Sequence, residues 1–324
     1  MNHFPVTASV LSATALATLI SEQYNLKDVN CTLLKTFVND SYHVSAGQEQ
    51  FIFRVYTRGW RSELEINEEI RMILTAHQND VGVSYPIMDT AGSYTQKMFA
   101  PEGDRFGVLF SFANGNKIFN VNEEQHRKLG EYLAELHRAT ADMKLHRVDY
   151  DAVTLLVYSY EKIQKYLKRS PDEEAFMLKT KQLLLDEFKK IKSEDVRKGG
   201  VHLDFWPDNF HIDSAGNVTL FDFDFCGTGF QVLDIAFYLT MLQGLEHDEN
   251  NFHAKTSAFI TGYEEVTKLS EEEKRIIPIL GSAISFYYMG VQSDRFATIF
   301  FNEDHLKRFI NIRLKRWMIS QRMI

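Results

Sequence analysis

The stretch 201–227 constrains the fold of this chain more than any other segment. It reads VHLDFWPDNFHIDSAGNVTLFDFDFCG, with two short apolar-rich segments, 210–212 and 218–221, on either side of a Ser-Ala-Gly-Asn turn. Apolar segments that flank a turn of this composition are typical of two antiparallel strands. The sequence therefore predicts a β-hairpin here.

Polar residues stand at both ends of this predicted hairpin. Asp204 and Asn209 precede its first strand, and Asp222 ends its second strand, with Asp224 just beyond. Folding the hairpin should bring these side chains to one mouth. Because the stretch contains no Lys or Arg, such a cluster needs a cation. Carboxylate and amide oxygens suit Mg²⁺, which usually takes phosphates and waters as further ligands. We predict a magnesium site formed by Asn209, Asp222 and Asp224.

These residue types match the requirements of phosphoryl transfer. One Asp orients the acceptor hydroxyl, while an Asn and a second Asp hold magnesium on the nucleotide phosphates. On this pattern Asp204 is the predicted catalytic residue. The alternative interpretation is a polar β-hairpin with surface aspartates.

The motif His202-x-Asp204-x-x-x-x-Asn209, followed by Asp222-Phe-Asp224, resembles the signature of the aminoglycoside phosphotransferase and choline kinase superfamily. Within it, the chain is most similar to homoserine kinase type II and the bacterial stress-response kinases. The resemblance covers nearly the whole chain and is most specific over residues 129–138 and 201–236.

This resemblance implies an α+β, bilobal protein-kinase-like fold. A small β-rich N-terminal lobe would span residues 1–113, and a mainly helical C-terminal lobe would span residues 114–324. It also implies ATP and Mg²⁺ as cofactors. The reaction would phosphorylate a hydroxyl of a small molecule such as an aminoglycoside, choline, ethanolamine or a homoserine-like acceptor.

The resemblance assigns supporting roles around Asp204. It implies that Asp234 braces the catalytic loop, and that His202 braces the loop by hydrogen bonding as part of the catalytic group. Two positions depart from the family pattern. Leu203 stands where the family usually has Gly, and Trp206 adds bulk beside Asp204. Trp206 would either shape the acceptor pocket or pack under the loop.

Arg54 lies in a predicted strand whose other residues are mostly apolar or aromatic. A cation at such a position must meet an anion or face solvent. The resemblance implies that it contacts the α and β phosphates and pairs with a helix glutamate. Glu65, Glu68 and Glu69 compete for that pairing, and we favour Glu69 because it lies beside the apolar face of the predicted helix 63–77. The alternative is an Arg that points outward to solvent.

Two further contacts with the nucleotide follow from the resemblance. The chain has no G-x-G-x-x-G motif after its first strands, and the family commonly covers the nucleotide with an Asn-containing turn, here at Asn39. A plain hairpin turn is an equally open interpretation of that position. The predicted strand 106–112 runs into a small, flexible segment, which would be the hinge between the lobes. Backbone groups of Ser111 to Ala113 would then bind adenine.

Apolar periodicity and turn residues predict the remaining elements. Predicted helices cover residues 12–23, 63–77, 123–140, 152–167, 172–191, 251–266, 271–291 and 304–323, and another begins at residue 232. Predicted strands cover residues 31–38, 42–45, 51–56, 85–87, 94–99 and 106–112.

Length, charge and cysteine content limit the fold, the partners and the compartment that we expect. A chain of 324 residues is long enough for two lobes. With 36 Lys and Arg against 44 Asp and Glu, its net charge of −8 argues against a nucleic-acid partner. Two cysteines imply no disulfide framework, and without a secretory signal at the start we expect a cytoplasmic protein.

Two segments raise the question of membrane contact. Residues 276–291 are apolar but short and interrupted by Pro and Gly, so we expect a buried helix. Residues 304–323 form a basic amphipathic pattern, which we expect to pack on the helical lobe and not on a membrane.

Three rival functions remain. A protein Ser/Thr kinase of the stress-response type would keep the same core and change only the acceptor. A catalytically silent nucleotide-binding module is disfavoured because every acid that the chemistry needs is present. A metal-dependent hydrolase built on His202 and Asp204 would need more converging histidines, and only His211 is close in sequence.

Overall fold

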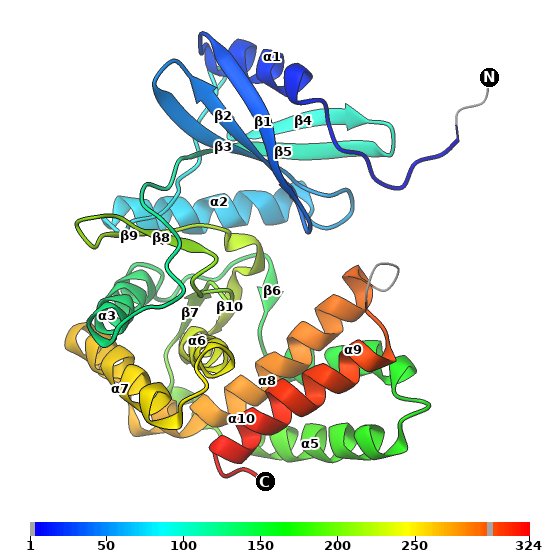
Figure 1. Ribbon diagram of the computed structural model, residues 1–324, viewed down its shortest axis with the longest axis vertical. Coiled ribbons are helices and arrows are strands. Elements are labelled where there is room, and N and C mark those ends of the chain that lie inside the picture. Colours follow the sequence, from blue (N-terminus) through cyan, green and yellow to red (C-terminus); the bar gives the residue numbers. More distant parts are fainter. Residues whose placement is uncertain (1–3, 297–300) are drawn as a thin grey trace. The chain divides into compact units, whose positions relative to one another are not determined.

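The computed structural model describes residues 4–296 and 301–324 (Figure 1). The chain divides into two compact units. Unit 1 comprises Met1–Asn116 and His211–Phe221, and unit 2 comprises Lys117–Phe210 and Asp222–Ile324. The boundary expected at residue 113 thus falls at residue 116. The segment 211–221 joins unit 1 instead of the C-terminal lobe in which we expected it.

Unit 1 is built on a five-stranded antiparallel sheet with strand order β1-β2-β3-β5-β4. A separate two-stranded sheet, β8-β9, carries the predicted hairpin. The elements are α1 (Ala13–Tyr24), β1 (Val29–Thr36), β2 (Asp40–Ala46), β3 (Glu49–Val55), α2 (Glu63–Gln78), β4 (Thr95–Ala100), β5 (Gly103–Ser111), β8 (Phe210–Ile212) and β9 (Val218–Leu220).

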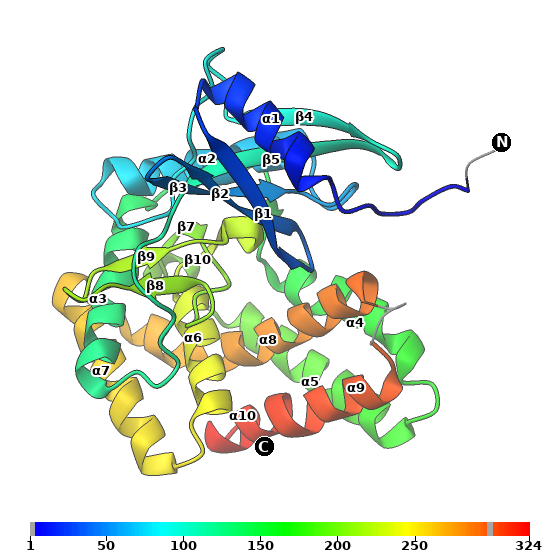
Figure 2. The ribbon, with the colours of Figure 1, turned by 45° about the horizontal axis from the view of Figure 1, so that its top comes forward.

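The two helices of unit 1 lie on opposite faces of the large sheet (Figures 1 and 2). The hydroxyl of Ser12 accepts a hydrogen bond from the Ala15 N–H and caps α1, whose apolar side packs with Phe53 and Val55 of β3. Because side chains alternate along a strand, Arg54 projects from the other face, toward α2. Strand β3 thus contributes core on one side and a charged residue on the other.

The segment before β4 explains why the hairpin belongs to unit 1. Residues 85–87, predicted as a strand, form only an isolated bridge between Pro86 and Phe110, because proline has no N–H for a ladder. Just before it, Gly82 accepts a hydrogen bond from the Leu220 N–H at 3.0 Å, and Ser84 donates one to the Leu220 carbonyl at 2.9 Å. Strand β9 therefore forms backbone hydrogen bonds with the segment 82–84 of unit 1.

Unit 2 is mainly helical and contains one three-stranded sheet with order β6-β10-β7. The elements are α3 (Glu123–Ala139), β6 (Val148–Asp149), η1 (Val153–Tyr158), α4 (Ser159–Ile163), η2 (Gln164–Tyr166), α5 (Pro171–Lys189), η3 (Ser193–Asp195), β7 (Lys198–Val201), η4 (Phe223–Phe225), β10 (Gly227–Phe230), α6 (Val232–Leu245), α7 (Glu249–Val266), α8 (Glu271–Arg295), α9 (Glu303–Arg308), η5 (Phe309–Leu314) and α10 (Lys315–Ser320).

Two predicted helices are interrupted. Residues 152–167 form η1, α4 and η2 in succession, and residues 304–323 form α9, η5 and α10. The first begins as the π-helix η1 and ends as the 3₁₀-helix η2, whereas the second changes to the π-helix η5 and then returns to an α-helix. Apolar periodicity reports that a segment is helical but does not resolve such local changes in the hydrogen-bond pattern.

Helix α8 runs through the middle of unit 2, and the segment α9–α10 lies along it (Figures 1 and 2). Trp317 is buried, its indole N–H donates to the Pro278 carbonyl at 3.0 Å, and its ring lies against Gly281. This confirms that the basic C-terminal segment packs on the helical unit. Within the described residues, α8 alone is long and apolar enough to cross a membrane, but 78% of that apolar window is buried inside the protein. Such burial is typical of a core helix.

Candidate active site

The loop between β7 and β8 is braced from beneath by Asp234 of α6. One oxygen of its carboxylate accepts the His202 N–H at 2.8 Å, and the other accepts the Leu203 N–H at 2.5 Å. The ring Nε2 of His137 lies 3.0 Å from the same carboxylate, and its Nδ1 lies 2.8 Å from the Tyr263 hydroxyl. All are buried. The predicted bracing role of Asp234 is confirmed.

His202 holds the next residue of the loop. Its Nδ1 accepts the Asp204 backbone N–H at 3.1 Å, and its ring packs edge-on against Phe223 at 4.5 Å between centroids. The side chain is fully buried. The predicted hydrogen bonding of His202 within the loop is therefore present, and its role in the reaction stays a prediction.

Leu203 adopts a left-handed backbone conformation, with φ of 57°. This region favours glycine, which accounts for the glycine that the family usually has at this position. The Leu203 side chain is fully buried. Its burial offsets the backbone strain, and its carbonyl accepts a 2.6 Å hydrogen bond from the hydroxyl of Tyr288 on α8.

Asp204 is held on both carboxylate oxygens. Asn209 donates from Nδ2 to Oδ2 at 2.6 Å and to the Asp204 carbonyl at 3.0 Å, and the Tyr288 hydroxyl lies 3.2 Å from Oδ1. Burial raises the pKa of Asp204 to about 8, and the negative charge of Asp222 adds to this rise. Burial also raises the pKa of Tyr288 well above its usual range, so its hydroxyl remains a donor. The carboxylate thus has a fixed orientation and close acidic neighbours.

The residues predicted to hold magnesium fit a hard cation. Because Asn209 uses its amide nitrogen toward Asp204, its amide oxygen is the atom suited to a metal. Asp222 follows β9 with a left-handed φ of 63°, and its charge acts on Asp204. Asp224 is buried, and its carbonyl accepts a 2.6 Å hydrogen bond from Arg147. The charges of Asp222 and Asp224 both act on Asp204. An amide oxygen and carboxylates are ligand types that suit Mg²⁺, which binds few protein ligands alongside phosphates, and metal binding by these residues stays a prediction.

The metal-dependent hydrolase alternative needs several converging histidines, and the described residues contain no such cluster. In residues 4–296 and 301–324, no group of three or more His, Cys, Asp and Glu side chains is arranged to hold a metal. His211, the nearest histidine in sequence, has its Nδ1 2.7 Å from the Ala113 carbonyl within unit 1. That bond ties the hairpin to the segment after β5.

The loop carries two aromatic residues, Phe205 and Trp206, which differ in burial. Phe205 is fully buried and packs against Tyr132 and Phe210 at 6.0 and 5.3 Å between ring centroids. Trp206 is half-buried and meets the edge of Phe119 at 6.5 Å. Phe205 therefore packs under the loop, whereas a role of Trp206 in acceptor binding stays a prediction.

In unit 1 the predicted pairing of Arg54 is confirmed. Its Nη1 lies 3.1 Å from Oε1 of Glu69, and both side chains are buried. Glu65 caps its own helix through Ser62, and Glu68 pairs with Arg71, which separates the three candidates. The guanidinium carbon of Arg54 also lies 5.4 Å from the centroid of Phe110. A solvent-facing Arg54 is excluded.

The turn at Asn39 is tied into the sheet. The Asn39 side-chain oxygen accepts the Thr57 N–H at 3.2 Å, and β2 already begins at Asp40, earlier than predicted. Arg105, which is buried, donates to Asp40 at 2.8 Å and to the Ser9 carbonyl at 2.6 Å. The side chain of Asn39 thus has a structural use, and nucleotide contact by this residue stays a prediction.

The backbone groups predicted to bind adenine also take part in bonds within unit 1. The Ser111 N–H donates to the Tyr85 carbonyl at 2.8 Å, and the Ser111 carbonyl accepts from Ser84. The Ala113 carbonyl oxygen lies 2.7 Å from the ring Nδ1 of His211. Adenine contacts by Ser111 and Ala113 would share these groups and stay a prediction.

Sequence reasoning missed Tyr288 and the Arg105–Asp40 pair. Tyr288 lies in an apolar helix beside Tyr287, where nothing in the local pattern separates a functional hydroxyl from a core aromatic ring. Arg105 stands just before the predicted strand 106–112 and belongs to β5 in the structure, and its charge at the edge of an apolar segment was the available signal. A buried arginine in a strand should prompt a search for an acid, as it did for Arg54.

Known proteins show which family this chain belongs to. Residues 32–267 match the Phosphotransferase enzyme family. A homoserine kinase of Hyphomonas neptunium is 27% identical over 265 residues, which cover 77% of this chain and 76% of that protein.

Two solved structures share the fold. An aminopropanol kinase associated with a microcompartment has a TM-score of 0.78 and is 18% identical. The match covers 97% of that chain and 95% of this chain. An amicoumacin kinase in complex with AMP-PNP, Ca²⁺ and Ami has a TM-score of 0.76 and is 21% identical. The match covers 92% of that chain and again 95% of this chain. The predicted kinase-like α+β fold is thereby confirmed. Since the family match spans most of the sequence, from β1 to the end of α7, the chain belongs to the phosphotransferase enzyme family.

Proposed function

We propose that this enzyme transfers the γ-phosphoryl group of ATP, in the presence of Mg²⁺, to the hydroxyl of a small amino alcohol or hydroxy amino acid. The observation that carries the proposal is the Asp204–Asn209 pair, held 2.6 Å apart on a loop braced by Asp234. A fixed carboxylate beside an amide and a second acid is the arrangement that phosphoryl transfer to an alcohol requires.

Asp204, in the ionised form that a bound cation would favour, would accept the proton of the acceptor hydroxyl. Its two oxygens are oriented by Asn209 and Tyr288, so little reorganisation is needed when the hydroxyl arrives. Asn209 and Asp222 would hold the divalent cation, with Asp224 in support. The cation, when bound, neutralises charge on the nucleotide phosphates.

Arg54 would contact the phosphates, and Glu69 would orient it. The buried ion pair fixes the guanidinium at one end, and the nearby Phe110 ring limits its movement. Arginine presents several donors in a rigid plane, which suits more than one phosphate oxygen. Most of the rate enhancement would therefore come from positioning and charge neutralisation.

The acceptor class follows from two lines of support. The homoserine kinase relative and the aminopropanol kinase neighbour are named for acceptors that combine an amine with a hydroxyl. The loop and the segment after β9 supply Asp204, Asp222 and Asp224, whose three charges act together at Asp204, exceed the two charges of the cation and would attract a cationic amine. A protein acceptor has no comparable support.

A turnover screen tests the proposal. The purified full chain, with ATP and Mg²⁺, is assayed for ADP formation with homoserine, 1-amino-2-propanol, ethanolamine, choline, an aminoglycoside and a generic protein substrate. We expect a small amino alcohol or hydroxy amino acid to give the highest kcat/KM. Turnover only with the protein substrate would favour the protein kinase alternative, and ATP binding without turnover on any acceptor would favour a silent module.

A further inference from the structure

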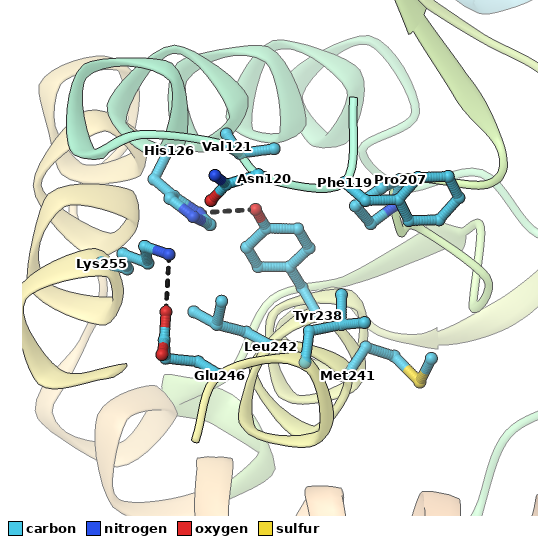
Figure 3. Close-up of a pocket in the computed structure, with 11 residues that line it drawn as sticks. Phe119, Asn120, Val121, His126, Pro207, Tyr238, Met241, Leu242, Glu246 and Lys255 are labelled. Atoms are coloured by element: carbon cyan, nitrogen blue, oxygen red, sulfur yellow. Dashed lines mark hydrogen bonds and ion pairs between the residues drawn. The ribbon is translucent and has the colours of Figure 1, made fainter. Parts of the chain in front are cut away.

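Helices α3, α6 and α7, the segment before α3 and Pro207 line a partly open cavity of about 320 Å³ within unit 2 (Figure 3). Ligand pockets in proteins span about 300–1,000 Å³, so this one suits a small molecule and not a nucleotide. The lining residues are Phe119, Asn120, Val121, His126, Pro207, Tyr238, Met241, Leu242, Leu245, Glu246 and Lys255. The residues assigned above to catalysis and metal binding are not among them.

The cavity has a polar end and an apolar end. In Figure 3 the ion pair of Lys255 and Glu246 lies at one side, whereas Phe119 and Pro207 lie at the other, with the aliphatic and aromatic side chains of α6 between them. The Lys255 Nζ lies 2.7 Å from Glu246 Oε2, and both side chains are mostly buried, at 18% and 17% exposed. An occupant should therefore have a polar head and an apolar body.

His126 adds no charge to the polar end. Its Nδ1 lies 2.7 Å from the Tyr238 hydroxyl, and Figure 3 shows the two side chains pointing toward one another. Burial lowers the pKa of His126 to about 4, and the positive charge of Lys255 contributes to this. The imidazole is thus neutral near pH 7, and Lys255 is the only Lys or Arg among the residues that line the cavity.

The hydrogen bonds at the ion pair decide the charge of the head group. Glu246 accepts from Lys255 on one oxygen and from the Asp248 N–H, at 3.2 Å, on the other. An ammonium has three N–H donors, and within the described residues Glu246 is the acceptor that Lys255 meets. Donor capacity therefore exceeds acceptor capacity at this end, which favours an anionic head over a cationic one.

We propose that this cavity binds a small carboxylate with an aromatic or branched apolar body. The carboxylate would bond to Lys255, and the body would lie against Leu242, Met241 and Phe119 and reach Pro207. Such binding gains from a charge-assisted hydrogen bond in a partly buried setting and from apolar burial.

The cavity shares a wall with the catalytic loop. Pro207 lines it, Trp206 of the same loop meets the ring of Phe119, and Asp208 pairs with Lys117 at 2.6 Å. An occupant that presses on Phe119 and Pro207 should steady the loop that ends at Asn209. Binding itself does not depend on the proposed function, and only an effect on turnover rests on it.

Binding is measured by titrating the full chain with 3-phenylpropionate and with 3-phenylpropan-1-ol, which has the same body without the charge. Isothermal calorimetry reports affinity, and fluorescence reports the loop, with Trp206→Phe as the control that removes its signal. We expect the carboxylate to bind at least about tenfold more tightly than the alcohol. Equal affinities, or no binding of the carboxylate at millimolar concentration, would overturn the proposal.

Two variants locate the site. Lys255→Met combined with Glu246→Gln removes the charge without leaving a buried acid unpaired, and it should abolish the preference for the carboxylate. Leu242→Phe fills the cavity and should weaken both probes. Melting temperatures show whether each variant is folded. If a variant does not fold, the relative affinity of the unaltered protein for the two probes still tests the proposal. Unchanged affinities in both folded variants would place the binding elsewhere and overturn the assignment.

Discussion

The hydroxyl of Tyr288 lies 3.2 Å from Oδ1 of Asp204, although 84 residues separate the two in sequence. The same hydroxyl donates to the Leu203 carbonyl at 2.6 Å. Helix α8 therefore fixes both the backbone of the catalytic loop and the direction of its carboxylate. This contact makes Tyr288 a positioning residue for the proposed reaction.

Replacing Tyr288 by Phe should lower kcat roughly 10- to 100-fold, because the single O–H that lies between the Leu203 carbonyl and the Asp204 carboxylate is lost. The ring remains and still packs on Phe225 and Phe237. Since the change lies away from the nucleotide, the KM for ATP should stay within about twofold. Steady-state kinetics separate the two constants. Tyr287→Phe is the matched control, since its hydroxyl lies 3.4 Å from the Tyr150 hydroxyl.

Asp204→Asn should reduce turnover by about 10²- to 10⁴-fold, the usual contribution of a general base. Nucleotide affinity, measured by calorimetry, should change only a few-fold. The control is Asp208→Asn in the same loop, which breaks the ion pair with Lys117 but removes no group assigned to the chemistry. If both variants lost activity equally, the assignment of Asp204 would be wrong.

Asn209→Ala and Asp222→Ala should each weaken the dependence of nucleotide binding on Mg²⁺. Both residues supply oxygens suited to the cation, and they stand at the two ends of the same hairpin. Titration of nucleotide with and without Mg²⁺ measures the effect. Asn217→Ala, which alters only the hairpin turn, is the control. Equal metal dependence in all three variants would contradict the proposed site.

Arg54→Ala should destabilise the protein by about 3–5 kcal/mol, because it leaves Glu69 buried without its partner. The double variant Arg54→Met, Glu69→Gln should recover much of that free energy of unfolding. Urea denaturation of the unliganded protein measures both. In the double variant the stabilisation by Mg²⁺ and ATP should still be reduced, and an unchanged ligand-linked shift in melting temperature would remove Arg54 from the phosphate site.

Leu203→Gly should lower stability by about 1–3 kcal/mol, even though glycine suits the positive φ. Relief of the left-handed conformation is worth about 1–2 kcal/mol. Removing a fully buried leucine side chain costs about 2–5 kcal/mol. Burial should win, and denaturant unfolding checks the sign. A more stable glycine variant would show that the strain at this position exceeds the value of the packing.

The sequence by itself determined the features that depend on short separations along the chain. The hairpin after Asn209 follows from its turn and strand residues, and the structure forms it as β8 and β9. The pairing of residues two to five positions apart, such as His202 with Asp204 and Asp204 with Asn209, is also local. Nearby groups on one chain have few conformations to lose, so spacing alone predicts their contact.

Only the tertiary structure decided the contacts that join distant segments. Glu69 is the partner of Arg54 because the faces of β3 and α2 meet there, although three glutamates compete in sequence. Tyr288 reaches Asp204 because α8 crosses beneath the loop, and the cavity beside Pro207 exists because three helices fail to fill the space between them. Such relationships depend on how whole elements pack, and packing is set by the sum of many side-chain contacts that no short pattern encodes.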